Sequence, residues 1–260
     1  MNTEDIEIVE VEDRSGRMRM LVMDGGMQSA TYIDKDRRNE LIFKYMIRFA
    51  ELSALNKEAE KVLLIGAGTF SYPKYLISEN SRIRIDALDP DEELFEYACD
   101  WFYLDELIEE YNLDETERLQ FIVDYGRDYL ENNDKKYDII INDAFNGLEP
   151  VPDLCTLEAM ELIHSRLNEN GMFLVNIPGW KDPDDSDFLK SSIETMKQVF
   201  THVVTVLAKG AFSGDDSMNY VIMASDTYDH FDEEIVVHSD GAPLFRDEDP
   251  ESIYECFDWV

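Results

Sequence analysis

Polar residues that could do chemistry stand at or just after the ends of predicted β-strands: Asp89, Asp124, Asp143 and Asn146. Asp143 directly follows the apolar strand predicted at 137–142, which places its carboxylate at the crevice where parallel sheets bind ligands. There it could take a proton from an attacking group. The alternative is that Asp143 caps the following loop through an Asx turn. Asp89 could accept the hydroxyl groups of a ribose, or it could cap the next helix.

A glycine turn follows another apolar strand, predicted at 62–65. Gly66 and Gly68 carry no Cβ atom, so the backbone can approach a ligand closely. Ser71 is expected to cap the next helix, and Pro73 suits its first turn. Strand, glycine turn and helix start are typical of a nucleotide pocket, although many such turns are only tight connections. The third glycine of the G-x-G-x-x-G fingerprint is absent, which disfavours a dehydrogenase.

Two aromatic residues lie near predicted strand ends. Tyr125 follows Asp124 where an adenine base would lie, and it could stack on the base or fill the rim of the site. Trp180 is placed in the loop after the strand predicted at 171–177. It could line an acceptor pocket or only close the loop, and we favour the pocket because that loop leaves the carboxyl end of a strand.

Hydrophobic periodicity predicts the elements that position these residues. The predicted strands of the main domain are 62–65, 83–88, 119–123, 137–142, 171–177, 202–207 and 219–224, and the predicted helices include 40–55, 91–103, 156–167 and 187–200. Strands that alternate with helices predict a doubly wound α/β fold, with seven mostly parallel strands. The last two strands should pair antiparallel, because no helix separates them.

Three parts of the chain are expected. Residues 1–38 contain alternating apolar segments and turns, which predict a small N-terminal β-hairpin appendage. Residues 39–225 form the predicted nucleotide-binding α/β domain. Residues 226–260 form an acidic C-terminal extension whose aromatic residues indicate either a docked arm or a dimer contact.

The composition limits the partners. Of 260 residues, 58 are acidic and 23 basic, for a formal net charge of −35. This charge disfavours nucleic acid and anionic membranes, which need clusters of Lys and Arg. It would attract small cations, or it could serve only solubility. The spacing of the cysteines and histidines predicts no metal site. We see neither a signal peptide nor a membrane-spanning run, so a cytoplasmic location is expected.

Five ordered motifs resemble the spermidine synthase family: GGMQS at 25–29, VLLIGAG at 62–68, ALDPDEELFEYACDWF at 87–102, DYGRDYL at 124–130 and KYDIIINDAF at 136–145. The resemblance covers roughly residues 5–225. It implies an N-terminal β-hairpin domain and the class I S-adenosylmethionine methyltransferase fold. It also implies transfer of an aminopropyl group from decarboxylated S-adenosylmethionine to putrescine, by dimers or tetramers.

The resemblance also implies roles for individual residues. Gln28 matches a substrate-site glutamine, Gly66 and Gly68 match the glycine loop, and Asp143 matches the aspartate that handles the attacking amine. Thr69 stands where the family has the aspartate that binds the donor's amine.

Other positions depart from the family pattern. Ala87 stands where the family has the acid that takes the ribose hydroxyls. Tyr125 replaces an adenine-side aspartate, and Asn146 replaces a second acid after Asp143.

The expected function is therefore a spermidine synthase-like transfer of an aminopropyl group to a polyamine acceptor. The expected protein is a homodimer that uses a small cationic amine substrate and no metal. One alternative is a methyltransferase that uses intact S-adenosylmethionine, which the loss of the amine-binding acid at Thr69 favours. The other is a non-catalytic homologue that binds a nucleoside or a polyamine, which the loss of several ligand carboxylates would suit.

Overall fold

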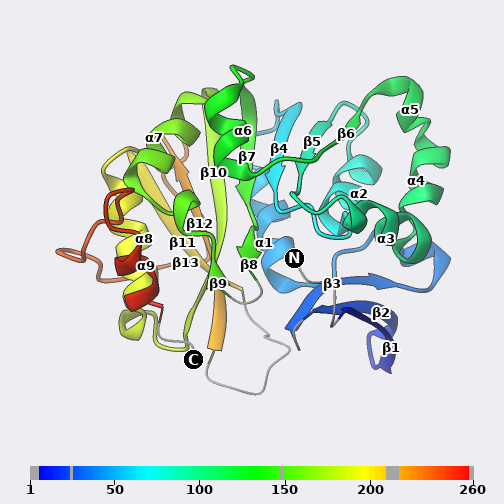
Figure 1. Cartoon of the computed structure of the whole chain (residues 1–260), viewed down its shortest axis with the longest axis horizontal. Helices are drawn as coiled ribbons and strands as arrows, with labels where there is room; N and C mark the ends of the chain where they lie inside the picture. Colours follow the sequence, from blue (N-terminus) through cyan, green and yellow to red (C-terminus); the bar gives the residue numbers. More distant parts are fainter. Residues whose placement is uncertain (1–5, 24–25, 147–148, 209–216, 258–260) are drawn as a thin grey trace.

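The computed structural model describes residues 6–23, 26–146, 149–208 and 217–257 (Figure 1). The described strands are β1 (Ile6–Asp13), β2 (Gly16–Met23), β3 (Gly26–Tyr32), β4 (Lys61–Ile65), β5 (Arg84–Leu88), β6 (Leu119–Ile122), β7 (Tyr137–Asn142), β8 (Phe145–Asn146), β9 (Glu149–Pro150), β10 (Leu167–Trp180), β11 (His202–Ala208), β12 (Ser217–Ser225) and β13 (Glu234–Ile235). The described helices are α1 (Lys44–Ser53), α2 (Ser71–Glu79), α3 (Glu93–Phe102), α4 (Leu104–Tyr111), α5 (Leu113–Thr116), α6 (Gly126–Asn132), α7 (Leu157–Ser165), α8 (Asp187–Lys197) and α9 (Glu251–Glu255). Short 3₁₀ turns are η1 (Lys35–Arg37), η2 (Pro152–Leu154) and η3 (Pro183–Asp185).

The main sheet has the strand order β13-β11-β12-β10-β7-β4-β5-β6. Strands β4, β5, β6, β7 and β10 run parallel, whereas β12 is antiparallel to both β10 and β11. The predicted doubly wound sheet and its antiparallel last pair are confirmed. After β4 the chain moves outward through β5 and β6, and it then returns to place β7 on the other side of β4. Such a switch point is where open α/β sheets form their ligand crevice.

The two faces of the main sheet are covered by different helices (Figure 1). Along β4, Val62 and Leu64 pack with α1, α2 and the N-terminal strands, while Leu63 and Ile65 pack with α6, α7 and α8. A strand buried on both faces cannot carry an alternating polar pattern. This burial explains why the sequence shows an uninterrupted apolar run here.

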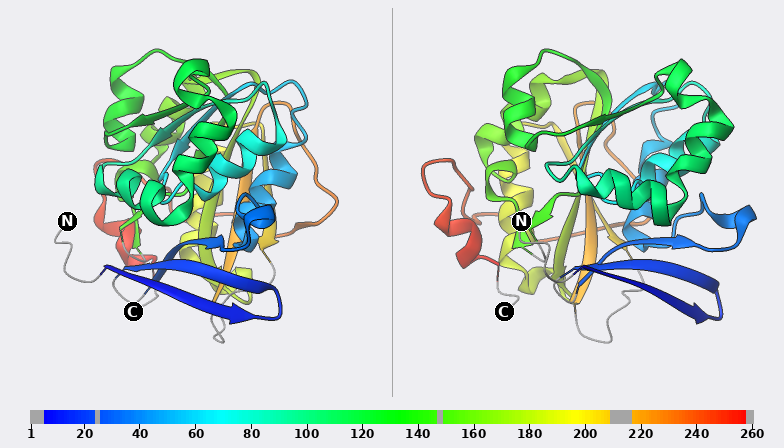
Figure 2. Two further views of the ribbon diagram at one scale, coloured as in Figure 1. Left: turned by 90° about the vertical axis from the view of Figure 1, so that its right-hand side faces the viewer. Right: turned by 45° about the vertical axis from the view of Figure 1, so that its right-hand side comes forward.

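The N-terminal residues form an antiparallel sheet of three strands in the order β1-β2-β3, which confirms the expected β-structure before the main sheet. It is the dark blue ribbon beneath the main body in Figure 2. Successive residues of β3 bond to the glycine turn and to α2: Thr69 N donates to Ser29 Oγ (3.1 Å), Ser71 Oγ to Ala30 O (3.0 Å), and Lys74 Nζ to Thr31 Oγ1 (3.1 Å). This sheet is therefore fixed directly to the segment that begins the expected pocket. Where the chain divides into domains stays a prediction.

The expected capping role of Ser71 is wrong. The residue before α2 is Phe70, which adopts a left-handed conformation with φ of 62°, and its side chain makes no capping bond. Ser71 is the first helical residue, and its hydroxyl donates to Ala30 O instead. Tertiary contact with β3 thus takes the hydroxyl that local sequence assigned to the helix end.

The structure also adds elements that the sequence pattern did not indicate. Helices α4, α5 and α6 lie within 104–132, where no helix was predicted. In α4 only Leu104 and Leu107 are buried, so its apolar stripe is narrow. Trp180 ends the long strand β10 and is paired with Ser217, so the loop predicted around it does not exist.

The C-terminal extension packs on the main domain. Its strand β13 pairs with β11 and adds an eighth strand to the sheet. Phe245 is fully buried and stacks on Phe188 of α8, with ring centroids 5.6 Å apart, and Phe257 packs edge-on against the same ring. Of the two alternatives for the extension, the described part forms a docked arm. Trp259 lies outside the described residues.

Replacement of Phe245 by Ala should destabilise the protein by about 3–5 kcal/mol, because it removes a fully buried ring and leaves a cavity. Urea unfolding of the full chain would measure the change. Tyr254→Ala is the control within the same extension, and we expect little effect because Tyr254 is 42% exposed. Equal losses in the two variants would contradict the packing described here.

Candidate active site

The glycine turn after β4 lies against the end of β7. Asp143 N donates to Ile65 O over 2.8 Å, and this bond continues the pairing of the two strands beyond β7. Gly66 has a φ of +88°, and a Cβ atom there would lie 2.5 Å from Asp143 O. Only glycine fits such a place, for both conformational and steric reasons. The turn and Asp143, predicted separately from the sequence, are therefore neighbours.

Every backbone amide of the turn is already bonded to protein. Gly66 N and Ala67 N donate to Leu88 O, at 2.9 and 3.1 Å. Gly68 N donates to Asp89 Oδ2 at 3.1 Å, and Thr69 N donates to Ser29 Oγ. Phosphate-binding turns hold phosphate oxygens with free amides. The turn therefore offers no free amide to a phosphate group, which disfavours the dinucleotide mode of binding.

Asp89 follows β5 and faces the glycine turn. Its side chain is buried, and Oδ1 accepts a hydrogen bond from Asp91 N at 3.1 Å. Because α3 begins at Glu93, Asp89 is not its cap. Burial raises the pKa of Asp89 to about 6, although the bonds from Asp91 N and Gly68 N favour the charged form. Ala87 is fully buried within β5, whereas Asp89 directly follows the last residue of that strand.

Asp143 is held by two side chains from other elements. Asn176 Nδ2, from β10, donates to Asp143 Oδ1 at 3.2 Å, and the Tyr45 hydroxyl, from α1, donates to the same carboxylate. Burial raises the pKa of Asp143 to about 7, and these two bonds oppose the rise. The following turn is closed by Asn142, whose Oδ1 accepts from Ala144 N at 3.2 Å. The Asx-type bond at this turn is therefore made by Asn142, and the capping alternative for Asp143 stays a prediction.

The remaining predicted residues are placed as follows. Gln28 stands at the register shift between β2 and β3, beside the residue that bonds the turn. Such bulges redirect side chains. Asp124 Oδ1 accepts a hydrogen bond from Tyr125 N at 2.9 Å. The Tyr125 side chain is 66% exposed, so it does not fill the rim of the site by packing against other protein groups. Asn146 pairs with Glu149 through the short strands β8 and β9.

Trp180 is tied to its surroundings through its backbone. Its N–H donates to Ser186 Oγ, and its carbonyl accepts from the Tyr220 hydroxyl, both over 2.6 Å. It stands at the carboxyl end of β10, the strand that also supplies Asn176. Its role as a lining residue of an acceptor pocket stays a prediction.

The comparison with known protein families decides the family. The model of the spermine/spermidine synthase domain matches residues 41–227. The chain belongs to this family.

Among curated proteins, the chain is similar to polyamine aminopropyltransferase 2 of Pseudomonas aeruginosa, at 28% identity over 187 residues that cover 71% of this chain and 50% of the relative. It is also similar to the polyamine aminopropyltransferase of Thermococcus kodakarensis, at 24% identity over 64% of this chain and 56% of the relative. The chain thus spans about half the length of these relatives.

Three solved structures share the fold. A probable spermidine synthase from Corynebacterium glutamicum matches with a TM-score of 0.68 and 22% identity, covering 86% of this chain and 78% of that one. A spermidine synthase in complex with the transition-state analogue AdoDATO matches with a TM-score of 0.63 and 18% identity, covering 98% of this chain and 82% of that one. A human methyltransferase-like protein 13 matches with a TM-score of 0.55 and 18% identity, covering 85% of this chain and 94% of that one. The methyltransferase-like α/β fold expected from the sequence is confirmed.

Thr69 stands where the sequence resemblance predicts an aspartate. Its side chain is fully buried, and its hydroxyl has no hydrogen-bond partner. A buried hydroxyl carries no negative charge, so it cannot replace a carboxylate that would bind the ammonium group of a ligand in the crevice. The turn therefore has no charged side chain at this position.

Three residues that the structure links to Asp143 were not indicated by the sequence pattern. They are Tyr45, Asn176 and Asn219, whose Nδ2 donates to Asn176 Oδ1 at 2.8 Å. Asn176 left a usable signal, because it is the one polar residue within the apolar segment from Met172 to Ile177. A single amide at such a buried position needs partners.

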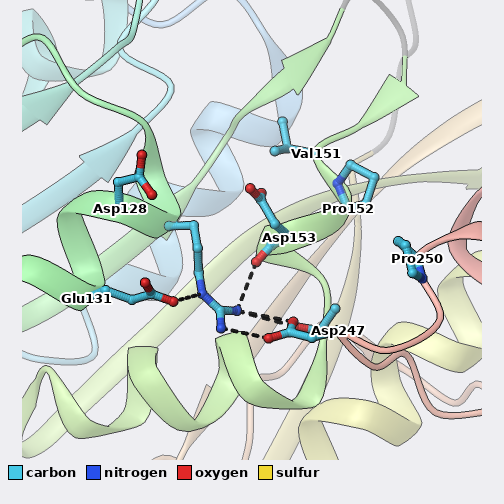
Figure 3. A pocket seen from close by; sticks show the side chains of 9 residues that line it. Asp128, Glu131, Val151, Pro152, Asp153, Asp247 and Pro250 are labelled. Carbon is cyan, nitrogen blue, oxygen red and sulfur yellow. Dashed lines mark hydrogen bonds and ion pairs between the residues drawn. The ribbon is translucent and has the colours of Figure 1, made fainter.

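A separate hollow of about 530 Å³ is lined by residues of α6, η2 and the C-terminal extension (Figure 3). Arg127 lines it and bonds Glu131, Asp247 and the carbonyl of Asp153. None of the residues predicted to bind ligand lines this hollow. The bonds of Arg127 join α6, η2 and the C-terminal arm, and so support the helix that follows Tyr125.

Within the described ranges, no group of three or more His, Cys, Asp or Glu side chains is arranged to hold a metal ion. Over the same residues, none of the helices combines the length and apolar character needed to cross a bilayer.

Replacement of Gly66 by Ala should destabilise the protein well beyond the roughly 1–3 kcal/mol of backbone strain at a positive φ, because the new methyl group would collide with the Asp143 backbone. Gly241→Ala is a matched control: its φ is +83°, and nothing lies within 4 Å of the added carbon. Urea unfolding would measure both variants. If both variants lost the same free energy of unfolding, the close approach between Gly66 and Asp143 would not contribute to the effect.

Proposed function

We propose that the protein transfers an aminopropyl group from decarboxylated S-adenosylmethionine to a polyamine acceptor. The observation that carries this proposal is the setting of Asp143 beside the glycine turn, bonded to Tyr45 and Asn176, with a pKa of about 7. A carboxylate with that pKa can accept a proton from a bound ammonium group near neutral pH. The aminopropyltransferase relatives support the same reaction.

The proposed donor site is the glycine turn with Asp89. Asp89 would accept the ribose hydroxyls, and the phosphate-free turn suits a nucleoside that carries a sulfonium rather than a pyrophosphate. Asp124 and Tyr125 would lie at the adenine, with Tyr125 exposed and so able to stack on the base. The strongly acidic chain would favour the approach of a cationic donor and a cationic acceptor.

The proposed acceptor site is formed around Asp143, with Gln28, Asn146 and Trp180 as further contacts. The acceptor's ammonium group gives a proton to Asp143, and its nitrogen lone pair then attacks the aminopropyl carbon bonded to sulfur. The new C–N bond forms as the C–S bond breaks, and the electron pair of that bond stays on sulfur. The products are the extended polyamine and 5′-methylthioadenosine. The main contribution of the protein is positioning, because the sulfonium is already activated.

Methyl transfer from intact S-adenosylmethionine is a second candidate, and Thr69 favours it. With the hydroxyl buried and no carboxylate at that position, the turn lacks the group that would hold the donor's amine. The expected homodimer and cytoplasmic location stay predictions.

The donor can be identified from the nucleoside product. The full chain, incubated with putrescine and either form of the donor, should release 5′-methylthioadenosine from the decarboxylated form and no S-adenosylhomocysteine from the intact form. Mass spectrometry would measure both products. Release of S-adenosylhomocysteine from the intact donor would contradict the proposal and support the methyltransferase alternative. Absence of both products over a panel of diamines would favour the non-catalytic alternative.

Asp143→Asn should lower the turnover by at least about a hundredfold, because an amide cannot accept the proton. Binding of methylthioadenosine, measured by calorimetry, should change little, since the lost group belongs to the acceptor side. Asp240→Asn is the control, because Asp240 is a fully exposed carboxylate. Full activity of the Asp143 variant would refute the assignment.

The turnover of the wild-type protein should fall as the pH is lowered through about 7. Below the pKa of Asp143 the carboxyl is protonated and cannot act as the base, so the rate should drop about tenfold per pH unit. Above this pKa the rate should reach a plateau. A profile that is flat between pH 5 and pH 8 would contradict a role for Asp143 as base.

A further inference from the structure

Two amide side chains connect β12 to Asp143. Asn176 and Asn219 lie on neighbouring antiparallel strands, where Asn176 faces Val221 and Asn219 faces Pro178. They are thus diagonal neighbours, close enough for their side chains to meet. Asn219 Nδ2 donates to Asn176 Oδ1 at 2.8 Å, and Asn176 Nδ2 donates to Asp143 Oδ1 at 3.2 Å.

The direction of the Asn176 amide matters for Asp143. Its nitrogen is a donor, so it favours the charged carboxylate when it points at Asp143, whereas its oxygen would favour the protonated acid. Asn176 is only 5% exposed, so bulk water has little access to fix its orientation. Asn219 Nδ2 donates to the amide oxygen of Asn176, so the amide nitrogen of Asn176 is directed toward Asp143.

We propose that Asn219 is a positioning residue: through the amide of Asn176, it keeps the Asp143 carboxyl ready to accept a proton. The link to turnover rests on the function proposed above. The link to protonation rests only on the three side chains and their bonds. Asn219 itself need not touch a substrate.

The other titratable group that the structure places against Asp143 is Tyr45 of α1. Burial and the neighbouring carboxylate raise the pKa of Tyr45 well above its usual value near 10. Its hydroxyl therefore stays protonated across the range in which Asp143 titrates, and it donates throughout. Among the described residues, the orientation of Asn176 is the variable part of this arrangement.

The first test is Asn219→Asp, which keeps the shape and removes the donor. Asn176 would then turn its nitrogen toward the new carboxylate and its oxygen toward Asp143. The midpoint of the pH profile of turnover should rise by about one unit, with the high-pH plateau largely kept. A merely structural role would lower the rate at every pH without moving the midpoint. Asn132→Asp adds the same charge at an exposed position and should leave the midpoint in place.

The second variant, Asn219→Leu, separates orientation from charge. It removes the donor without adding a carboxylate, so Asn176 loses its fixed direction, and the midpoint should still rise, by less than in Asn219→Asp. A shift in the aspartate variant alone would show that charge acts instead of orientation, and would overturn the proposal. An unchanged midpoint in both variants would also overturn it.

A readout without catalysis keeps this test independent of the proposed function. The stability of each protein is compared with that of its own Asp143→Asn form across pH. The pKa of Asp143 is higher in the folded protein than its unfolded value of about 3.9. The protein with Asp143 therefore loses stability relative to its Asp143→Asn form as the pH rises from about 4 to about 7. Above that range the difference in stability between the two forms is constant. The upper end of this range should move upward in both Asn219 variants. If no transfer is ever detected but this end moves, only the proposed function fails.

Discussion

The backbone of Gly66 passes so close to the backbone of Asp143 that no side chain fits between the glycine turn and the end of β7. This contact lies at the switch point of the sheet, between β4 and β7. It brings together the residues that follow β4 and β7, two strands that are far apart in the sequence but adjacent in the sheet. The backbone amides of the turn donate to Leu88 and Asp89 at the end of β5 and to Ser29 of β3, so two strands fix the position of the turn.

The N-terminal sheet is part of this arrangement. Through bonds from β3 to the turn and to α2, it holds the start of α2 and places the bulge at Gln28 beside the turn. Lys74, which is fully buried, also donates to Phe102 O and so ties β3 to the end of α3. Lys74 is only 1% exposed, and this burial lowers its pKa to about 7. The first strands therefore help to position the site.

Two opposing effects set the charge of Asp143. Burial favours the protonated acid, whereas the donors from Tyr45 and Asn176 favour the carboxylate, and the result is a pKa near 7. Asp89 shows the same balance at the other side of the turn, with a pKa of about 6. A carboxylate on the open surface would be a weaker base at neutral pH, and one without donors would stay protonated. The neighbours thus decide what each carboxylate can do.

The sequence by itself determined the sheet, because strands buried on both faces must be apolar throughout and are separated by turns and helices with their own patterns. It also indicated Gly66, Asp89 and Asp143, since residues at the carboxyl ends of parallel strands meet at one edge. Only the tertiary structure decided their partners. The side chains of Ser71, Asn176 and Asn219 bond residues that lie between 33 and 43 positions away in the chain. Local patterns carry no information on such pairs, because they depend on which strands become neighbours in the folded sheet.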